Sequence, residues 1–194
     1  MIVGLTGGVA TGKSEVSKMF NRYGAIIIDA DKISRDVVNK KEVLSNITEY
    51  FGKDIMKKGK LDRKKLGKIV FSDEEKKKKL NEITHPLIIE ELKKYIDKYK
   101  ESKELIIFDI PLLFEVNFEK YLNKVIVVYC GFEIELNRLM KRENINYSEA
   151  VNIIKSQMDL KEKLEKGDIL IENSGTIEEL EEKVFRLYSK LKRD

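Results

Sequence analysis

The feature that most constrains this fold is a glycine-rich segment, Gly7 to Ser14, which reads GGVATGKS and matches the pattern G-x-x-x-x-G-K-[ST]. Residues 2–6 before it are an apolar run that predicts a buried strand, and residues 13–23 after it carry apolar side chains at helical spacing. A strand before and a helix after are the context in which this pattern binds phosphate. Glycines let the backbone come close to a ligand, so that successive N–H groups and the helix N-terminus can point at phosphate oxygens.

The end of this segment predicts how a nucleotide is held. The Lys13 ammonium is expected to bridge the β- and γ-phosphates of ATP, and the Ser14 hydroxyl is expected to bind Mg²⁺. The remaining residues of the predicted cofactor-binding loop supply backbone groups around the phosphates; they are Gly8, Val9, Ala10, Thr11 and Gly12.

The rest of the chain alternates between strand and helix patterns. Four further apolar, β-branched runs predict strands at residues 25–29, 105–109, 124–130 and 168–172. Strands that alternate with helices form parallel sheets. The sequence therefore predicts an α/β fold of the P-loop NTPase type, a five-stranded parallel sheet flanked by helices on both faces.

Several helix boundaries are also predicted. Ser72 with Glu75, and Thr176 with Glu179, fit capping boxes at the start of helices. His85-Pro86 is expected to interrupt one helix and open another, and residues 148–166 read as a single charged helix.

Composition excludes several classes of protein. The 194 residues contain 38 Lys and Arg against 34 Asp and Glu, and both signs are mixed along the chain, which does not indicate nucleic-acid binding. A single cysteine, Cys130, cannot form an internal disulfide. No apolar run approaches 18 residues, and the first residues enter a strand directly, so we expect no membrane span, no targeting segment and a cytoplasmic location.

Motifs outside the phosphate loop distinguish between the classes of phosphate-loop protein. A GTPase would need Asn-Lys-x-Asp, and Asn123 to Ile126 begins that way but lacks the aspartate, so small-molecule kinases remain the main class.

An alcohol acceptor needs a group that takes its proton, and the carboxylates of Asp29-Ala30-Asp31, after the second predicted strand, can supply one. Asp29 and Asp31 would share one side if the strand extends that far. Asp31 also suits the N-cap of the next helix, and spacing alone leaves both roles open.

A set of motifs over nearly the whole chain resembles the dephospho-CoA kinase family. The set is Gly4 to Gly8 with Gly12-Lys13-Ser14, Asp29-Ala30-Asp31, His85-Pro86-Leu87-Ile88, Pro111 to Glu115 and Asn173-Ser174-Gly175. The resemblance implies transfer of the ATP γ-phosphoryl group to the ribose 3′-hydroxyl of dephospho-CoA. It also implies a nucleotide-binding core (1–31, 102–132 and 167–194), a helical acceptor-binding insert (32–101) and a helical lid (133–166). We expect the chain to act as a monomer on a small-molecule substrate.

The same resemblance assigns roles to residues. Asp31 would be the base on the acceptor hydroxyl, beside the acceptor-site residues His85 and Leu113. Arg138 and Arg142, four apart on the lid helix and so on one face, would neutralise the transferring phosphoryl group. An ion pair of either arginine with Glu135 or Glu143 is the competing interpretation.

Three more positions belong to the nucleotide side of the predicted site. Asp109 would hold a Mg²⁺-bound water, although helix capping explains it nearly as well, and Asn173 would meet the nucleotide. Glu15 departs from the family pattern, because a threonine that can touch the α-phosphate is usual there. A carboxylate removes that donor and repels phosphate, which puts ATP affinity in question but not the reaction.

Two other functions compete with this interpretation. Another P-loop small-molecule kinase, acting on a nucleoside or a nucleoside monophosphate, would share the fold, but the His-Pro insert and Asp-Ala-Asp argue against it. A nucleotide-sensing protein without turnover would not need Asp31 and Arg142, which only the chemistry requires.

Overall fold

The computed structural model describes residues 1–57 and 59–193. The chain divides into two compact units, one made of Met1–Asp29 with Ile96–Asp194 and the other of Ala30–Tyr95. Each unit is described by itself.

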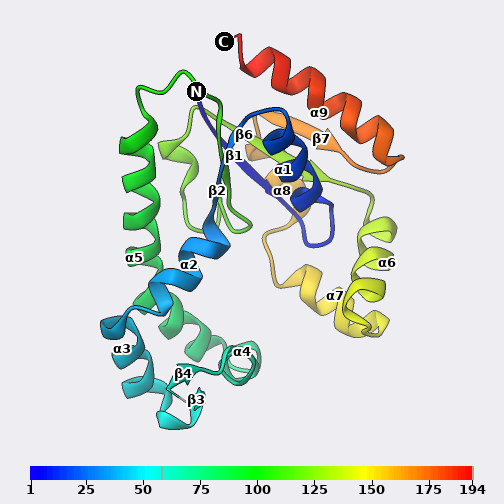
Figure 1. Ribbon diagram of the computed structural model, residues 1–194. Helices are drawn as coiled ribbons and strands as arrows, with labels where there is room; N and C mark the ends of the chain where they lie inside the picture. Colours follow the sequence, from blue (N-terminus) through cyan, green and yellow to red (C-terminus); the bar gives the residue numbers. More distant parts are fainter. Residues whose placement is uncertain (58, 194) are drawn as a thin grey trace. The chain divides into compact units, whose positions relative to one another are not determined.

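The first unit is built on a parallel sheet in the order β2-β5-β1-β6-β7 (Figure 1). The strands are β1 (Ile2–Gly7), β2 (Ile26–Asp29), β5 (Ile106–Asp109), β6 (Lys124–Tyr129) and β7 (Ile169–Glu172). Every neighbouring pair is parallel, which confirms the predicted five-stranded sheet. Because the strands run the same way, the loops after β1, β5 and β7 leave from one edge.

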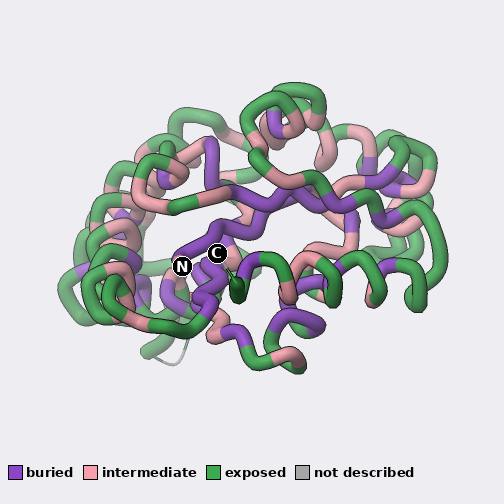
Figure 2. Tube along the Cα trace, turned by 90° about the horizontal axis from the view of Figure 1, so that it is seen from above, coloured by how far each residue is buried: buried purple, intermediate pink, exposed green. Residues whose placement is uncertain are grey.

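One face of the sheet is covered by α1 (Lys13–Arg22) and α9 (Ile177–Leu191). Their apolar stripes form one core with the strands. Burial of each Leu or Phe in this core contributes about 1.5–3 kcal/mol. The three central strands β1, β5 and β6 are buried over most of their length, and buried segments run through the middle of the trace in Figure 2. The capping box predicted for α9 is present, with Thr176 accepting from the Glu179 N–H and Glu179 accepting from the Thr176 N–H.

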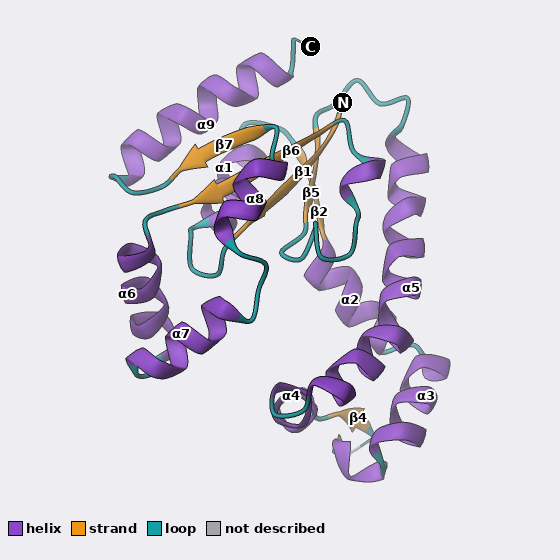
Figure 3. Cartoon of the chain, turned by 180° about the vertical axis from the view of Figure 1, so that it is seen from behind, coloured by secondary structure: helices purple, strands orange, loops and turns teal. Residues whose placement is uncertain are grey.

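The opposite face is covered by α8 (Leu160–Lys166) and by the segment after β5, which includes the short helix η2 (Glu119–Tyr121). A side chain on Gly4 would lie 2.5 Å from Leu113 Cδ1 and 2.6 Å from Leu122 Cδ1, so this segment packs directly on the strand backbone. Helices therefore cover both faces, as predicted (Figure 3).

Two more helices of this unit, α6 (Phe132–Glu143) and α7 (Tyr147–Lys155), pack on each other through Leu136, Leu139 and Ala150. The prediction of one helix over residues 148–166 is wrong. The chain leaves α7 after Lys155 and starts α8 at Leu160, because the Asp159 carboxylate accepts a hydrogen bond from the Lys161 N–H at 2.8 Å and caps a new helix.

The second unit is mainly helical. Its elements are α2 (Ala30–Val38), α3 (Lys41–Phe51), η1 (Lys53–Ile55), a hairpin of β3 (Met56–Lys57) and β4 (Lys60–Leu61), α4 (Arg63–Phe71) and most of α5 (Glu74–Tyr99).

Two predictions in this unit need correction. His85-Pro86 does not separate two helices, because α5 is one helix of 26 residues with Pro86 inside it. A proline removes one backbone hydrogen bond, and the helix-forming Lys, Glu and Leu residues on both sides continue the helix across it. Ser72 does not cap α5, because its hydroxyl donates back to the Lys68 carbonyl at 3.0 Å; Asp73 accepts from the Lys76 N–H instead.

Candidate active site

The loop between β1 and α1 has a backbone that only certain residues allow. Ala10 has φ 57° and Gly12 has φ 93°. A side chain on Gly7 would overlap the Val128 carbonyl oxygen of β6, and one on Gly12 would overlap the Asn173 amide nitrogen. The Thr11 hydroxyl donates to the Gly8 carbonyl at 2.9 Å and closes the turn. The loop is thus tightly folded over the carboxyl edge of the sheet.

Asn173, at the end of β7, holds this loop from the far end of the chain. Its side chain is buried and its Nδ2 donates to the Thr11 carbonyl at 2.8 Å. The structure therefore places Asn173 against the loop itself, where it fixes the backbone that would bind phosphate.

The first turn of α1 presents the groups expected to meet a nucleotide. Within the described chain no side chain caps this helix, so its first N–H groups are available to an anion. Lys13 and Ser14 lie in that turn, and Ser14 is exposed. The Glu15 carboxylate pairs with Lys18 at 3.3 Å, which partly offsets the negative charge that departs from the family pattern.

Lys13 and Asp109 form an ion pair, and each side chain is mostly buried. Asp109 ends β5, directly beside β1, where it pairs in register with Leu5. The structure thus brings together Lys13, which is predicted to bind phosphate, and Asp109, which is predicted to hold a Mg²⁺-bound water. The phosphates of a nucleotide would offer Lys13 a second anionic partner. Asp109 would then be available to hold the Mg²⁺-bound water.

The two arginines of α6 lie in different surroundings. The Arg138 guanidinium donates from Nη1 to the Asn173 carbonyl at 3.0 Å, so it lies at the loop that holds the phosphate loop. Arg142 instead pairs with Glu143 at 2.8 Å and is more than half exposed. Arg142 therefore makes the surface ion pair that was the competing interpretation of its sequence position.

Among the predicted acceptor residues, Asp31 lies in the first turn of α2. Strand β2 ends at Asp29, so the expectation of an extended strand carrying Asp29 and Asp31 on one side is wrong. Asp31 is not an N-cap residue either, because α2 already begins at Ala30. A carboxylate in a first helical turn is favoured by the helix dipole, which stabilises the charged form that a base requires.

His85 and Leu113 differ in accessibility. His85 is half-buried in α5 and lines a cavity of about 380 Å³ together with Glu74, Lys77 and Lys78. Burial lowers the pKa of His85, which favours a neutral imidazole. Leu113 is fully buried against Gly4, so it packs in the core, whereas its neighbour Leu112 is exposed.

A cluster of buried charges beside the phosphate loop was missed in the sequence. Glu135 of α6 and Lys163 of α8 are both almost fully buried, and Lys163 Nζ lies 2.9 Å from Glu115 Oε1. Glu135 and Lys163 line a cavity of about 340 Å³ that reaches Gly8. Burial raises the pKa of Glu135 to about 7, while Lys163 opposes the shift. In the sequence, Glu135 and Lys163 both look like exposed charges on solvated helices. Only Glu115 could be noticed there, because it lies in the Pro-Leu-Leu-Phe-Glu motif.

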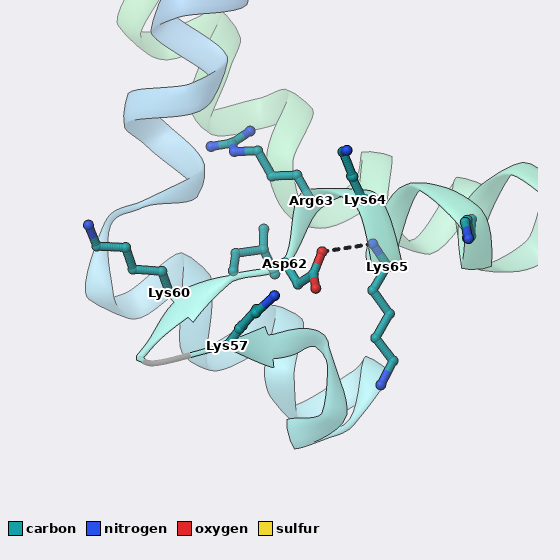
Figure 4. Close-up of a pocket in the computed structure, with 8 residues that line it drawn as sticks. Lys57, Lys60, Asp62, Arg63, Lys64 and Lys65 are labelled. Atoms are coloured by element: carbon teal, nitrogen blue, oxygen red, sulfur yellow. Dashed lines mark hydrogen bonds between the residues drawn. The ribbon is translucent and has the colours of Figure 1, made fainter.

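A hollow in the second unit, of about 1020 Å³, is rich in cations (Figure 4). The labelled cationic ends, those of Lys57, Lys60, Arg63, Lys64 and Lys65, point in different directions, so they do not converge on one ligand. The Asp62 carboxylate accepts from the Lys65 N–H at 3.0 Å and caps α4. We treat this hollow as a basic surface.

Among the residues that the structure describes, none of the helices combines the length and the apolar character that a membrane span requires. No group of three or more His, Cys, Asp or Glu residues in this described part of the chain could hold a metal ion.

A phosphate loop at the carboxyl edge of a five-stranded parallel sheet, with a lysine and an aspartate meeting at its end, is the arrangement of P-loop nucleotide-binding proteins. The family model described as dephospho-CoA kinase matches residues 1–179. The chain belongs to the dephospho-CoA kinase family.

Individual relatives agree over nearly the full length. The dephospho-CoA kinase of Fusobacterium nucleatum is 46% identical over 187 residues, which cover 96% of each chain. The dephospho-CoA kinase of Bacillus anthracis is 45% identical and covers 91% of this chain and 90% of its own. Among solved structures, dephospho-CoA kinase from Campylobacter jejuni has a TM-score of 0.78 at 31% identity, covering 99% and 97%. Shikimate kinase from Acinetobacter baumannii, at 15% identity and TM-score 0.56, shares the fold alone.

Proposed function

We propose that this chain transfers the γ-phosphoryl group of ATP to the ribose 3′-hydroxyl of dephospho-CoA, giving coenzyme A and ADP. The observation that carries the proposal is the meeting of Lys13 and Asp109 at the end of a phosphate loop, in a chain of this family. In the reaction the 3′-oxygen forms a bond to the γ-phosphorus, the bond to the β-phosphate oxygen breaks, and the hydroxyl proton leaves.

On the nucleotide side, the loop N–H groups and Lys13 bind the β- and γ-phosphates. Ser14 and Asp109 fit a magnesium ion, because a hydroxyl in the first turn of α1 and a carboxylate at the end of the adjacent strand supply the oxygen ligands that Mg²⁺ prefers. When bound, the ion neutralises charge on the phosphates. Arg138, which is fixed on the Asn173 carbonyl, adds a cation at the edge of the loop.

On the acceptor side, Asp31 takes the proton of the 3′-hydroxyl late in the transition state. Its carboxylate lies in the first turn of α2, directly after the end of β2. Residues 32–101, with His85, are the acceptor-binding insert, and residues 133–166 are a lid that closes over ATP and excludes water. We expect a monomeric enzyme that acts in the cytoplasm.

The proposal is tested by acceptor competition. The full chain is mixed with Mg²⁺-ATP and equal amounts of dephospho-CoA, adenosine, AMP and shikimate, and the products are weighed by mass spectrometry. Added phosphate on dephospho-CoA, placed at the 3′-oxygen, supports the proposal. Phosphate on another acceptor alone would move the chain to another kinase specificity. Lys13→Ala serves as the inactive control.

A further inference from the structure

The Glu135 carboxyl lies against the phosphate loop. A side chain on Gly8 would come within 2.5 Å of Glu135 Oε1, so the carboxyl fills the space that this glycine leaves. Only 3% of Glu135 is exposed. A buried acid is therefore held directly beside the backbone that is expected to bind the phosphates of ATP.

The charges around Glu135 come from several elements. Lys163 of α8 faces it, but the Lys163 ammonium already pairs with Glu115 from the segment after β5. The cavity that Glu135 lines also receives Lys155 and Asp159, from the end of α7 and the start of α8. Burial acts against an ionised Glu135 carboxylate, and the charge of Lys163 offsets this effect only in part. The arrangement thus supplies little that would hold an ionised carboxylate.

The two charge states of Glu135 have opposite effects on a nucleotide. An ionised carboxylate beside Gly8 repels the phosphates, whereas the protonated acid is neutral and can donate a hydrogen bond. We propose that Glu135 is a positioning residue that acts through the phosphate loop, that it carries a proton when the loop is occupied, and that nucleotide binding takes this proton up from solvent. The inference rests on the ATP-binding part of the proposed function.

The amount of proton taken up depends on how far Glu135 is already protonated in the free protein. Burial raises the pKa of Glu135 to about 7 before any nucleotide is present. Such a carboxyl is partly ionised at pH 7.5, so full protonation on binding takes up a fraction of a proton. Because bound phosphates disfavour the ionised form, they raise the pKa further. The affinity for Mg²⁺-ATP should then fall as pH rises above 7, by up to about tenfold per unit.

Isothermal titration calorimetry of Mg²⁺-ATP tests this in two buffers that differ in ionisation enthalpy. The wild-type chain should take up a measurable fraction of a proton at pH 7.5. Glu135→Gln, which mimics the neutral acid, should bind without uptake and with an affinity that is flat between pH 6.5 and 8.5. Glu133→Gln is the matched control, because Glu133 lies on the same turn of α6 but is exposed; it should behave as wild type.

The possible results distinguish a failure of this inference from a failure of the proposed function. Wild-type binding without proton uptake, or an unchanged uptake in Glu135→Gln, overturns the inference but leaves the proposed function standing. A failure of the wild type to bind Mg²⁺-ATP at any pH overturns both. If Glu135→Gln does not fold, Glu135→Met removes the titrating group instead and should likewise bind Mg²⁺-ATP without proton uptake, whereas uptake equal to that of the wild type overturns the inference. In steady state, Glu135→Gln should change the pH dependence of KM for ATP and leave kcat near wild type.

Discussion

Asn173 donates a hydrogen bond from its side chain to the carbonyl of Thr11 across 162 positions of sequence, at 2.8 Å. The same residue accepts from Arg138 through its own carbonyl at 3.0 Å. The shape of the phosphate loop therefore depends on a residue from the last strand, which in turn is tied to the helix that carries the predicted catalytic arginines.

Removal of the Asn173 side chain should loosen the loop. Asn173→Ala leaves the Thr11 carbonyl without its partner in a buried place, which costs about 1–3 kcal/mol. We expect a lower Tm and a higher KM for ATP. Asn137→Ala, on the exposed side of α6, should change neither. Equal values for both variants would mean that the contact does not shape the loop.

The glycine at the end of the loop should not tolerate a side chain. Gly12→Ala forces a Cβ into the Asn173 amide at a φ of 93°, which L-residues rarely adopt. ATP binding should be lost. Gly67→Ala is the control, because Gly67 lies in α4 with open space around it and should gain about 0.5–1 kcal/mol of stability. Nucleotide titrations and urea unfolding of both variants check this pair, and normal ATP affinity in Gly12→Ala would contradict the described loop.

The Lys163–Glu115 pair should be costly to break from one side. Lys163 is almost fully buried, so Lys163→Met leaves Glu115 without its cation and should cost about 3–5 kcal/mol in urea unfolding. The double variant Lys163→Met with Glu115→Gln removes both charges and should recover much of that loss. A double variant as unstable as the sum of the single ones would show that the two groups do not interact.

Arg138 and Arg142 should separate kinetically. Arg138→Ala removes the hydrogen bond to the Asn173 carbonyl and should raise KM for ATP as well as lower kcat. Arg142 lies in a surface ion pair with Glu143, which is worth about 0–1 kcal/mol, and is free to leave it. Arg142→Ala should therefore lower kcat more than ATP affinity, because its contribution is made in the transition state. A wild-type kcat in Arg142→Ala would mean that Arg142 makes only its surface ion pair with Glu143 and does not contribute to the reaction.

The sheet and the phosphate loop could be predicted from the sequence because their signals are local. An apolar run such as residues 105–108, followed by Asp109, indicates a buried strand without knowledge of its neighbours. The capping box of Thr176 and Glu179 is local as well.

Two kinds of feature could not be predicted, helix boundaries where the local pattern fits two arrangements and contacts between residues distant in sequence. The single helix expected over residues 148–166 is split because Asp159 starts a new one, and the pattern of Lys and Glu residues there fits either arrangement. Lys163 and Glu135 look like solvated charges until the fold places them beside Gly8. Pro86 inside α5 shows that a strong local signal can also be overridden by the helix on both sides of it.

The central claim is that Asp31 takes a proton from an alcohol acceptor, and Asp31→Asn tests it most directly. Asparagine is nearly isosteric but a poor base, so kcat for dephospho-CoA should fall about 10²–10⁴-fold. The phosphate loop is untouched, so Mg²⁺-ATP affinity and Tm should stay close to wild type. Measurement of kcat in Asp31→Asn, beside wild type at saturating substrates, decides the matter. A loss within that range supports the account, and turnover near the wild-type value would contradict it.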